Sequence, residues 1–329
     1  MTGNRSIPYT IDGLQYCNWD RPIFEEMRRG GVTAVHVTIA YWEDARETLQ
    51  NIGRWNGWFE QHSDLIMPLR TAGDVERAHA QDKTAIMFGF QNCSPIEDNI
   101  DLVQIFHDLG VRFMQLSYNN QSPLATGCYE AEDAGITRFG KQVIAEMNRV
   151  GMVVDMSHSA ERSTLEAIEL SQRPIAITHA NPASWHPATR NKSDTVLKAL
   201  GESGGMLGFS LYPFHLNEHS QCRLDDFCAM VARTADLMGI DHIGIGSDLV
   251  QGHDDSVVRW MRDGRWRKDS EGEGGAARWP EPLPWFHNNL DFGNIADGLL
   301  AQGFSCGDVD KVMGGNWLRF IVGAWQPAT

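Results

Sequence analysis

Paired cysteines are missing from this chain of 329 residues. No two of its cysteines form a C-x-x-C motif, which argues against a disulfide framework or a zinc knuckle. We therefore expect free thiols, many of them buried. The six cysteines are scattered along the chain as Cys17, Cys93, Cys128, Cys222, Cys228 and Cys306.

The chain also lacks long apolar runs and is poor in basic residues. No stretch approaches the length of a membrane span, and the N-terminal sequence MTGNRSIPYTIDG has no apolar signal-peptide core, so we expect a cytoplasmic location. Lys and Arg number 28 against 43 Asp and Glu, a net charge of -15. A phosphate backbone or an anionic membrane would be repelled, so we expect neither nucleic acid nor a membrane as the main partner.

Eight short apolar segments alternate with helical sequence, and we find no fixed-period repeat. Continuous apolar runs are typical of parallel strands buried on both faces. Strand-helix alternation of this kind predicts an α/β fold, a single (β/α)8 TIM barrel over residues 1–329 with helices at the C-terminal end. The predicted strands are 7–14, 32–39, 84–90, 111–117, 151–156, 174–178, 205–210 and 241–247.

A long loop after the eighth strand interrupts this alternation. Residues 250–289 contain three prolines and four tryptophans, and the segment is too long for a plain connector. It is either a lid over the active site or a surface for a partner, and its place after the last strand favours a lid. A final apolar helix ending near residue 324 is expected to pack across the barrel.

Two histidines occupy matching positions in the strand-helix-strand segment 151–181. His158 closes one predicted strand and His179 the next. In a parallel barrel both would project from the carboxyl ends of neighbouring strands, where ligands and metals bind. Neutral imidazoles suit zinc, although a lone buried histidine is more often a hydrogen-bonded core residue. A metal or catalytic role and a structural role remain equally open from these residues alone.

Other polar residues also end predicted strands. Gln91, Tyr118 and Asp248 would join the two histidines at one mouth of the barrel. Two histidines with an aspartate suit hydrolysis at a metal, and Asp248 could act as general base. The alternative for Asp248 is a capping role at the start of a helix.

Two further residues have competing interpretations. Arg190 could hold a substrate carboxylate through two hydrogen bonds, but the residues alone favour a surface pair with Asp194. His253 could be an additional ligand or a proton carrier, but a single loop histidine more often has neither role.

Several motifs together resemble the membrane (renal) dipeptidase family of amidohydrolase-type barrels. They are DMSH at 155–158, ITH at 177–179, RNKSD at 190–194, IGIGSD at 243–248 and MGGNWLRF at 313–320. The resemblance implies a (β/α)8 barrel, hydrolysis of dipeptides or related amides at a zinc centre, and a homodimer. It implies that His158 and His179 bind zinc, that Asp248 lies beside the catalytic water, and that Arg190 holds the substrate carboxylate.

The chain departs from the family pattern at one of the two metal sites. The family has D-G-H-x-D after its first strand, whereas Leu14 and Tyr16 stand here in place of the histidine and the second aspartate. Gln91 replaces the glutamate that bridges the two metals, and Tyr118 replaces a histidine that contacts substrate. Leucine cannot bind a metal, so we expect at most one zinc ion, or none.

The residues that remain predict a hydrolase of a small amide or dipeptide-like compound that bears a carboxylate. His158 and His179 would hold the ion, with Gln91 or Asp248 as third ligand. Asp248 would be the base, Tyr118 or His179 would help stabilise the oxyanion, and Arg190, Tyr118 and Gln91 would contact substrate. The alternatives are a metal-free barrel that only binds a small molecule and a metal-dependent enzyme with a changed reaction. Leu14 and Tyr16, with the tryptophan-rich segment 250–289 over the mouth, suggest an aromatic or otherwise apolar substrate.

Overall fold

The computed structural model describes residues 8–265 and 278–325, in which all strands pair in parallel in one sheet. Each of the eight predicted strands is present. A short extended segment at Ile66–Pro68 adds a further strand, β3. The strands are β1 (Thr10–Gln15), β2 (Val32–Ala40), β3 (Ile66–Pro68), β4 (Thr84–Phe90), β5 (Val111–Gln115), β6 (Val153–Asp155), β7 (Ala176–Ala180), β8 (Met206–Phe209) and β9 (Ile243–Ile245).

The sheet closes into a barrel because β4 pairs with β2 as well as with β5. Strand β4 pairs with β2 along one edge and with two strands, β3 and β5, along its other edge. Its first half pairs with β3 and its second half with β5. Strand β3 is therefore an addition outside a closed ring of eight strands, and the predicted TIM barrel is confirmed.

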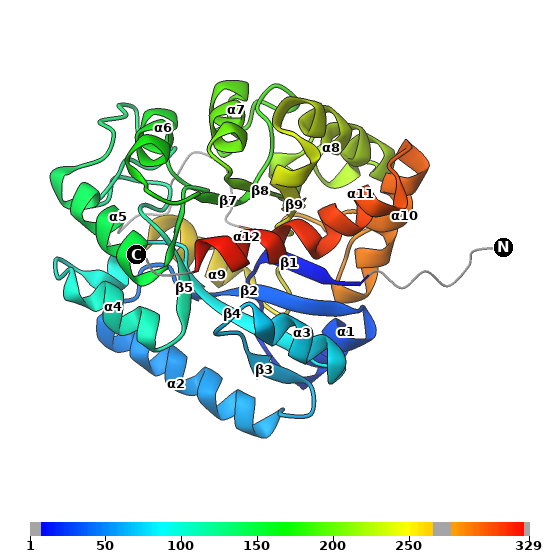
Figure 1. Cartoon of the computed structure of the whole chain (residues 1–329), viewed down its shortest axis with the longest axis horizontal. Coiled ribbons are helices and arrows are strands. Elements are labelled where there is room, and N and C mark those ends of the chain that lie inside the picture. Colours follow the sequence, from blue (N-terminus) through cyan, green and yellow to red (C-terminus); the bar gives the residue numbers. More distant parts are fainter. Residues whose placement is uncertain (1–7, 266–277, 326–329) are drawn as a thin grey trace.

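Helices surround the strand ring, as Figure 1 shows. Capping residues mark the starts of two of them: the Thr137 and Ser193 side chains each accept a main-chain hydrogen bond from the first turn of the helix that follows. The helix after β4 begins at Asp101 and is preceded by a 3-10 turn at Ser94–Ile96. The helices that follow strands β1 to β8 are α1 (Arg21–Arg29), α2 (Ala45–Gln61), α3 (Gly73–Ala80), α4 (Asp101–Asp108), α5 (Arg138–Val150), α6 (Glu161–Leu170), α7 (Asp194–Glu202) and α8 (Leu224–Met238).

The segment predicted as a long loop contains a helix, α9 (Asp255–Asp263), which begins after the capping side chain of Asp254. The rest of the segment includes residues 266–277, which lie outside the described residues. Val258, Met261 and Arg262 of α9 line the pocket at the barrel mouth. The predicted position over the mouth is therefore confirmed for the described part. The prediction that the segment is a loop throughout was wrong, because it contains α9.

The last helix of the chain closes the opposite end of the barrel. Helices α10 (Phe292–Gln302) and α11 (Cys306–Asp310) lead through a π-helical turn at Lys311–Gly315 into α12 (Asn316–Ala324). Trp317 of α12 is buried against Ile11, Phe113 and Met206, and its indole N–H donates to the main-chain oxygen of Ile245 at 2.8 Å. Helix α12 crosses the middle of the ring in Figure 1, as predicted.

All six cysteines are free thiols, in agreement with their scattered positions. Within residues 8–265 and 278–325, none of the helices is long and apolar enough to cross a bilayer.

Candidate active site

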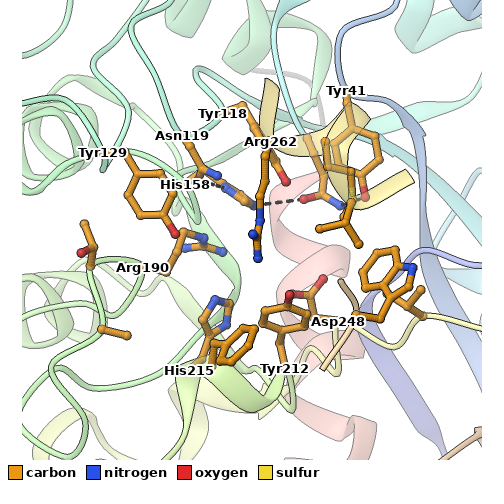
Figure 2. Close-up of a pocket in the computed structure, with 18 residues that line it drawn as sticks. Tyr41, Tyr118, Asn119, Tyr129, His158, Arg190, Tyr212, His215, Asp248 and Arg262 are labelled. Carbon is orange, nitrogen blue, oxygen red and sulfur yellow. Dashed lines mark hydrogen bonds between the residues drawn. The ribbon is translucent and has the colours of Figure 1, made fainter. Parts of the chain in front are cut away.

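A cavity of about 130 Å³ lies at the carboxyl ends of the strands, where polar side chains converge (Figure 2). The structure brings five of the predicted site residues to its wall. The sixth, His179, lies behind His158, within hydrogen-bonding distance of its ring. The five on the wall are Gln91, Tyr118, His158, Arg190 and Asp248.

His158 and His179 meet through their Nε2 atoms. His158 lies in the turn after β6, whereas His179 is a residue of β7 and is fully buried. The two Nε2 atoms are 3.0 Å apart. Burial, with a contribution from the nearby Arg190 cation, holds the pKa of both imidazoles well below the ordinary value, so both are neutral at pH 7.

The neighbours of the two rings determine which nitrogen of each carries the proton. His158 Nδ1 lies 2.6 Å from the side-chain oxygen of Asn119, which can only accept, so Nδ1 donates. His179 Nδ1 lies 2.9 Å from the Thr178 hydroxyl, and that hydroxyl donates its own proton to Asp155 at 2.6 Å. The Thr178 oxygen therefore accepts from His179 Nδ1. Both Nε2 atoms are left unprotonated and facing each other.

This arrangement fits a zinc ion. Two unprotonated nitrogens 3.0 Å apart repel each other unless a cation lies between them. Gln91 supplies a third donor, because its side-chain oxygen lies 3.1 Å from His158 Nε2. The Gln91 amide nitrogen donates to Thr38 and Tyr41, which turns the oxygen towards the histidines. Two imidazoles and one oxygen form a donor set that zinc accepts, with a fourth position left open.

The described residues contain no group of three or more His, Cys, Asp or Glu side chains arranged to hold a metal. A third protein ligand for an ion held by His158 and His179 would be of another type, such as the Gln91 amide oxygen.

Asp12 has a structural role at the first strand. Its carboxylate accepts hydrogen bonds from the Ser247 hydroxyl and main-chain N–H and from the Gln15 amide at 2.8 Å. Burial outweighs these bonds and raises its pKa to about 6. The carboxylate oxygens are thereby committed to the protein rather than to a metal.

Apolar and aromatic contacts fill the remainder of the first-strand side. Leu14 is fully buried, and the Tyr16 ring stacks on His253 with centroids 4.6 Å apart. His253 therefore contacts Tyr16 and does not approach His158 or His179 as a ligand. The structure places no second metal donor set on this side among the described residues.

Arg190 is buried in the pocket wall. Its guanidinium donates to the main-chain oxygens of Ser157 and His179, the latter at 3.0 Å. The predicted surface pair between Arg190 and Asp194 is wrong, because the Asp194 carboxylate instead accepts a hydrogen bond from the Ser184 hydroxyl at 2.6 Å. The two main-chain contacts fix the guanidinium in place, so its charge is available to a bound anion.

Asp248 follows β9 and lines the same pocket. It adopts a left-handed backbone conformation, with φ of 57°, and its N–H donates to the Leu14 oxygen. The helix cap considered for Asp248 is supplied by Asp254 instead. Burial raises the pKa of Asp248 to about 7, Arg190 lowers it, and Asp12 raises it. A carboxyl group with this pKa suits a general base near neutral pH.

Tyr118 covers one face of the His158 ring, with centroids 4.0 Å apart. Burial raises the pKa of its phenol well above the ordinary value, so the hydroxyl keeps its proton and can donate a hydrogen bond.

Sequence reasoning missed several residues of the pocket. Asn119 follows Tyr118 directly, and its contact with His158 depends on a side-chain hydrogen bond that no motif records. His215 lies in the loop after β8, with Nδ1 2.8 Å from the Ser210 hydroxyl. Tyr212 and Arg262 line the outer part of the pocket. His215 could have been found from the sequence, because it follows a barrel strand. The place of Arg262 in the pocket depends on helix α9, which was not predicted.

Comparison with known sequences identifies the family. The profile of the membrane dipeptidase family (peptidase family M19) matches residues 21–261. Dipeptidase tcpJ of Claviceps purpurea is 26% identical over 279 residues, 84% of this chain and 59% of that protein. Dipeptidase aclJ of Aspergillus oryzae is 25% identical over 286 residues, 85% of this chain and 61% of that protein. The chain thus spans less than two thirds of these relatives.

Solved structures share the architecture over nearly the whole chain. An amidohydrolase from Pseudomonas aeruginosa is 36% identical, with a TM-score of 0.89 and 97% of each chain covered. A metallo peptidase from Rhodobacter sphaeroides, liganded with a phosphinate mimic of the dipeptide L-Ala-D-Ala, has a TM-score of 0.80 at 18% identity over 96% of this chain and 99% of its own. The second likeness shows the barrel fold alone. The family profile spans most of the barrel and its site residues, so this chain belongs to the membrane dipeptidase family.

Proposed function

We propose that this protein is a dipeptidase-like metallohydrolase that cleaves a small amide or dipeptide bearing a carboxylate, with at most one zinc ion. One observation carries the proposal: the unprotonated Nε2 atoms of His158 and His179 face each other beside Gln91, in a pocket that also holds Arg190 and Asp248. Membership of the dipeptidase family supports the same reaction class.

His158, His179 and Gln91 would hold the ion. Zinc bound there would polarise the scissile carbonyl and lower the pKa of water at the open position. Asp248 would accept a proton from the attacking water and return it to the leaving amine, as its pKa of about 7 permits.

Arg190 would bind the substrate carboxylate and thereby fix the amide bond relative to the histidines. Its two main-chain hydrogen bonds keep the guanidinium in one orientation before substrate arrives. The Tyr118 hydroxyl would donate a hydrogen bond to the oxyanion that forms at the carbonyl. We extend the proposal to a homodimer, on the sequence resemblance, and to a cytoplasmic location.

Metal analysis and a dipeptide panel test the proposal together. Protein purified without refolding and supplied with zinc should bind about one equivalent and hydrolyse dipeptides or N-acyl amino acids. Less than a tenth of an equivalent would contradict it, and two equivalents at the barrel mouth would contradict the single-ion part. One equivalent with tight ligand binding but no turnover of any amide would favour a binding protein or a changed reaction.

A further inference from the structure

Helix α9 adds a second arginine to the pocket. Figure 2 shows the Arg262 side chain directed into the cavity that also contains Arg190 and Asp248. These three are the only Lys, Arg, Asp or Glu side chains on the cavity wall among the described residues. Two guanidinium groups therefore face one carboxyl group, in a protein with a net charge of -15. Such local reversal of charge favours an anionic ligand.

The position of Arg262 is fixed by contacts on both sides of α9. The Trp42 indole donates to the Met261 oxygen at 3.1 Å, and the Trp279 indole donates to the Asp254 oxygen at 2.9 Å. Arg265, just after the helix, pairs with Glu47 of α2. These contacts join α9 to the barrel, so Arg262 is presented to the cavity by a supported helix.

Arg262 differs from Arg265 in its surroundings. Arg265 has a carboxylate partner, whereas no ion pair within the described residues includes Arg262. Its neighbours on the cavity side are the phenols of Tyr129 and Tyr212. Phenols can orient a guanidinium but do not neutralise it, so its charge remains available to a ligand.

We propose that the substrate carries two carboxylates, one bound by Arg190 and the other by Arg262. This rests on the proposed function and narrows it to dipeptides, or N-acyl amino acids, whose C-terminal residue is aspartate or glutamate. Arg190 lies beside the histidines and takes the main-chain carboxylate, because the scissile bond must lie near them. Arg262 lies on the helix that covers the mouth and takes the side-chain carboxylate. The cavity of about 130 Å³ suits a compact molecule of this kind.

The test compares acidic ligands with isosteric amides. Binding of N-acetylaspartate and N-acetylasparagine to zinc-loaded protein is measured by calorimetry, and kcat/KM is measured for Ala-Asp and Ala-Asn. The wild type should prefer the acidic member by at least about tenfold in both, since a second charge-assisted bidentate contact is lost with the amide. Arg262→Met should reduce the preference to less than about threefold. Arg259→Met is the matched control, because Arg259 is exposed on the same helix and should leave the preference unchanged.

Reversing the charge at position 262 gives an independent test. Arg262→Glu should change the substrate preference from Ala-Asp to Ala-Lys, and thermal melting should show that each variant is folded. Equal binding of the acid and the amide by the wild type, or an unchanged preference in Arg262→Met, would overturn the proposal. Selective binding without hydrolysis of any substrate would support the second carboxylate site and count against the hydrolase itself.

Discussion

His158 and His179 present unprotonated Nε2 atoms to each other across 3.0 Å. Their Nδ1 protons are already given to Asn119 and Thr178, so neither ring can donate to the other while both are neutral. A cation between them removes the repulsion. The surrounding hydrogen bonds thus favour a cation at this position.

Removal of one imidazole should abolish metal binding. We expect His158→Ala to reduce zinc from about one equivalent to less than a tenth, because Gln91 and His179 alone bind weakly. Elemental analysis after dialysis measures the content. His79→Ala, an exposed histidine of α3, should retain the wild-type content. Retention of zinc by His158→Ala would place the ligands elsewhere.

The Asn119 side chain should affect metal affinity without touching the metal. Asn119→Leu removes the acceptor that orients the His158 ring, and we expect zinc affinity to fall by about 10–100-fold. Competition with a chelator of known affinity measures the change. Asn119→Asp keeps an acceptor and should retain most of the affinity, and equal loss in both variants would refute this role.

Arg190→Met should raise KM far more for substrates with a free carboxylate than for their amidated counterparts, by about tenfold or more. Steady-state kinetics on matched pairs measures the difference. The substitution also leaves the Ser157 and His179 oxygens without their donor, which should cost about 1–3 kcal/mol of folding free energy. An equal rise in KM for both members of a pair would mean that Arg190 acts only through the fold.

Asp248 should make the metal-free protein less stable as pH rises. Its pKa is about 7 in the folded state against 3.8 for an ordinary aspartate, so the folded state retains the proton longer than the unfolded state does. The stability contributed by the protonated group is complete below pH 3.8 and is lost as pH rises through about 7. Asp248→Asn should therefore match the wild-type melting temperature near pH 4 and exceed it at pH 8. A constant difference across this range would contradict the raised pKa.

Trp317 should be among the strongest contributors to stability on α12. We expect Trp317→Ala to destabilise the protein by about 3–5 kcal/mol, because it empties a buried site and removes the hydrogen bond to Ile245. Denaturant unfolding measures the loss. Val322→Ala, an exposed position on the same helix, should change stability by less than about 0.5 kcal/mol.

The strands could be predicted because a parallel strand buried on both faces is mostly apolar. All eight barrel strands are buried along their length, although β1 and β5 include the polar residues Asp12 and Arg112. Helix α9 was not predicted. Its sequence, DSVVRWMRD, is rich in charged residues, and contacts from Trp42 and Trp279 support it from outside. Such contacts between distant segments leave no local pattern.

The positions of His158, His179 and Asp248 at the mouth could be predicted from the strand ends, but their hydrogen-bonding state could not. The Nδ1 partners of the two histidines depend on rotamers and on strand register. The contacts of Arg190 could not be predicted either. Its proximity to Asp194 in the sequence favoured an ion pair, whereas the loop turns the Arg190 guanidinium towards main-chain oxygens.

The packing of α12 under the strand ring has a consequence for biosynthesis. Trp317 fills the floor of a barrel whose first strand begins at Thr10, so the core between these two segments is incomplete until Trp317 has been translated. A nascent chain that has already formed its strands still exposes Phe113 and Met206 at the open floor. Co-translational chaperones would therefore encounter an apolar opening at this end of the barrel, at the pole opposite the catalytic pocket.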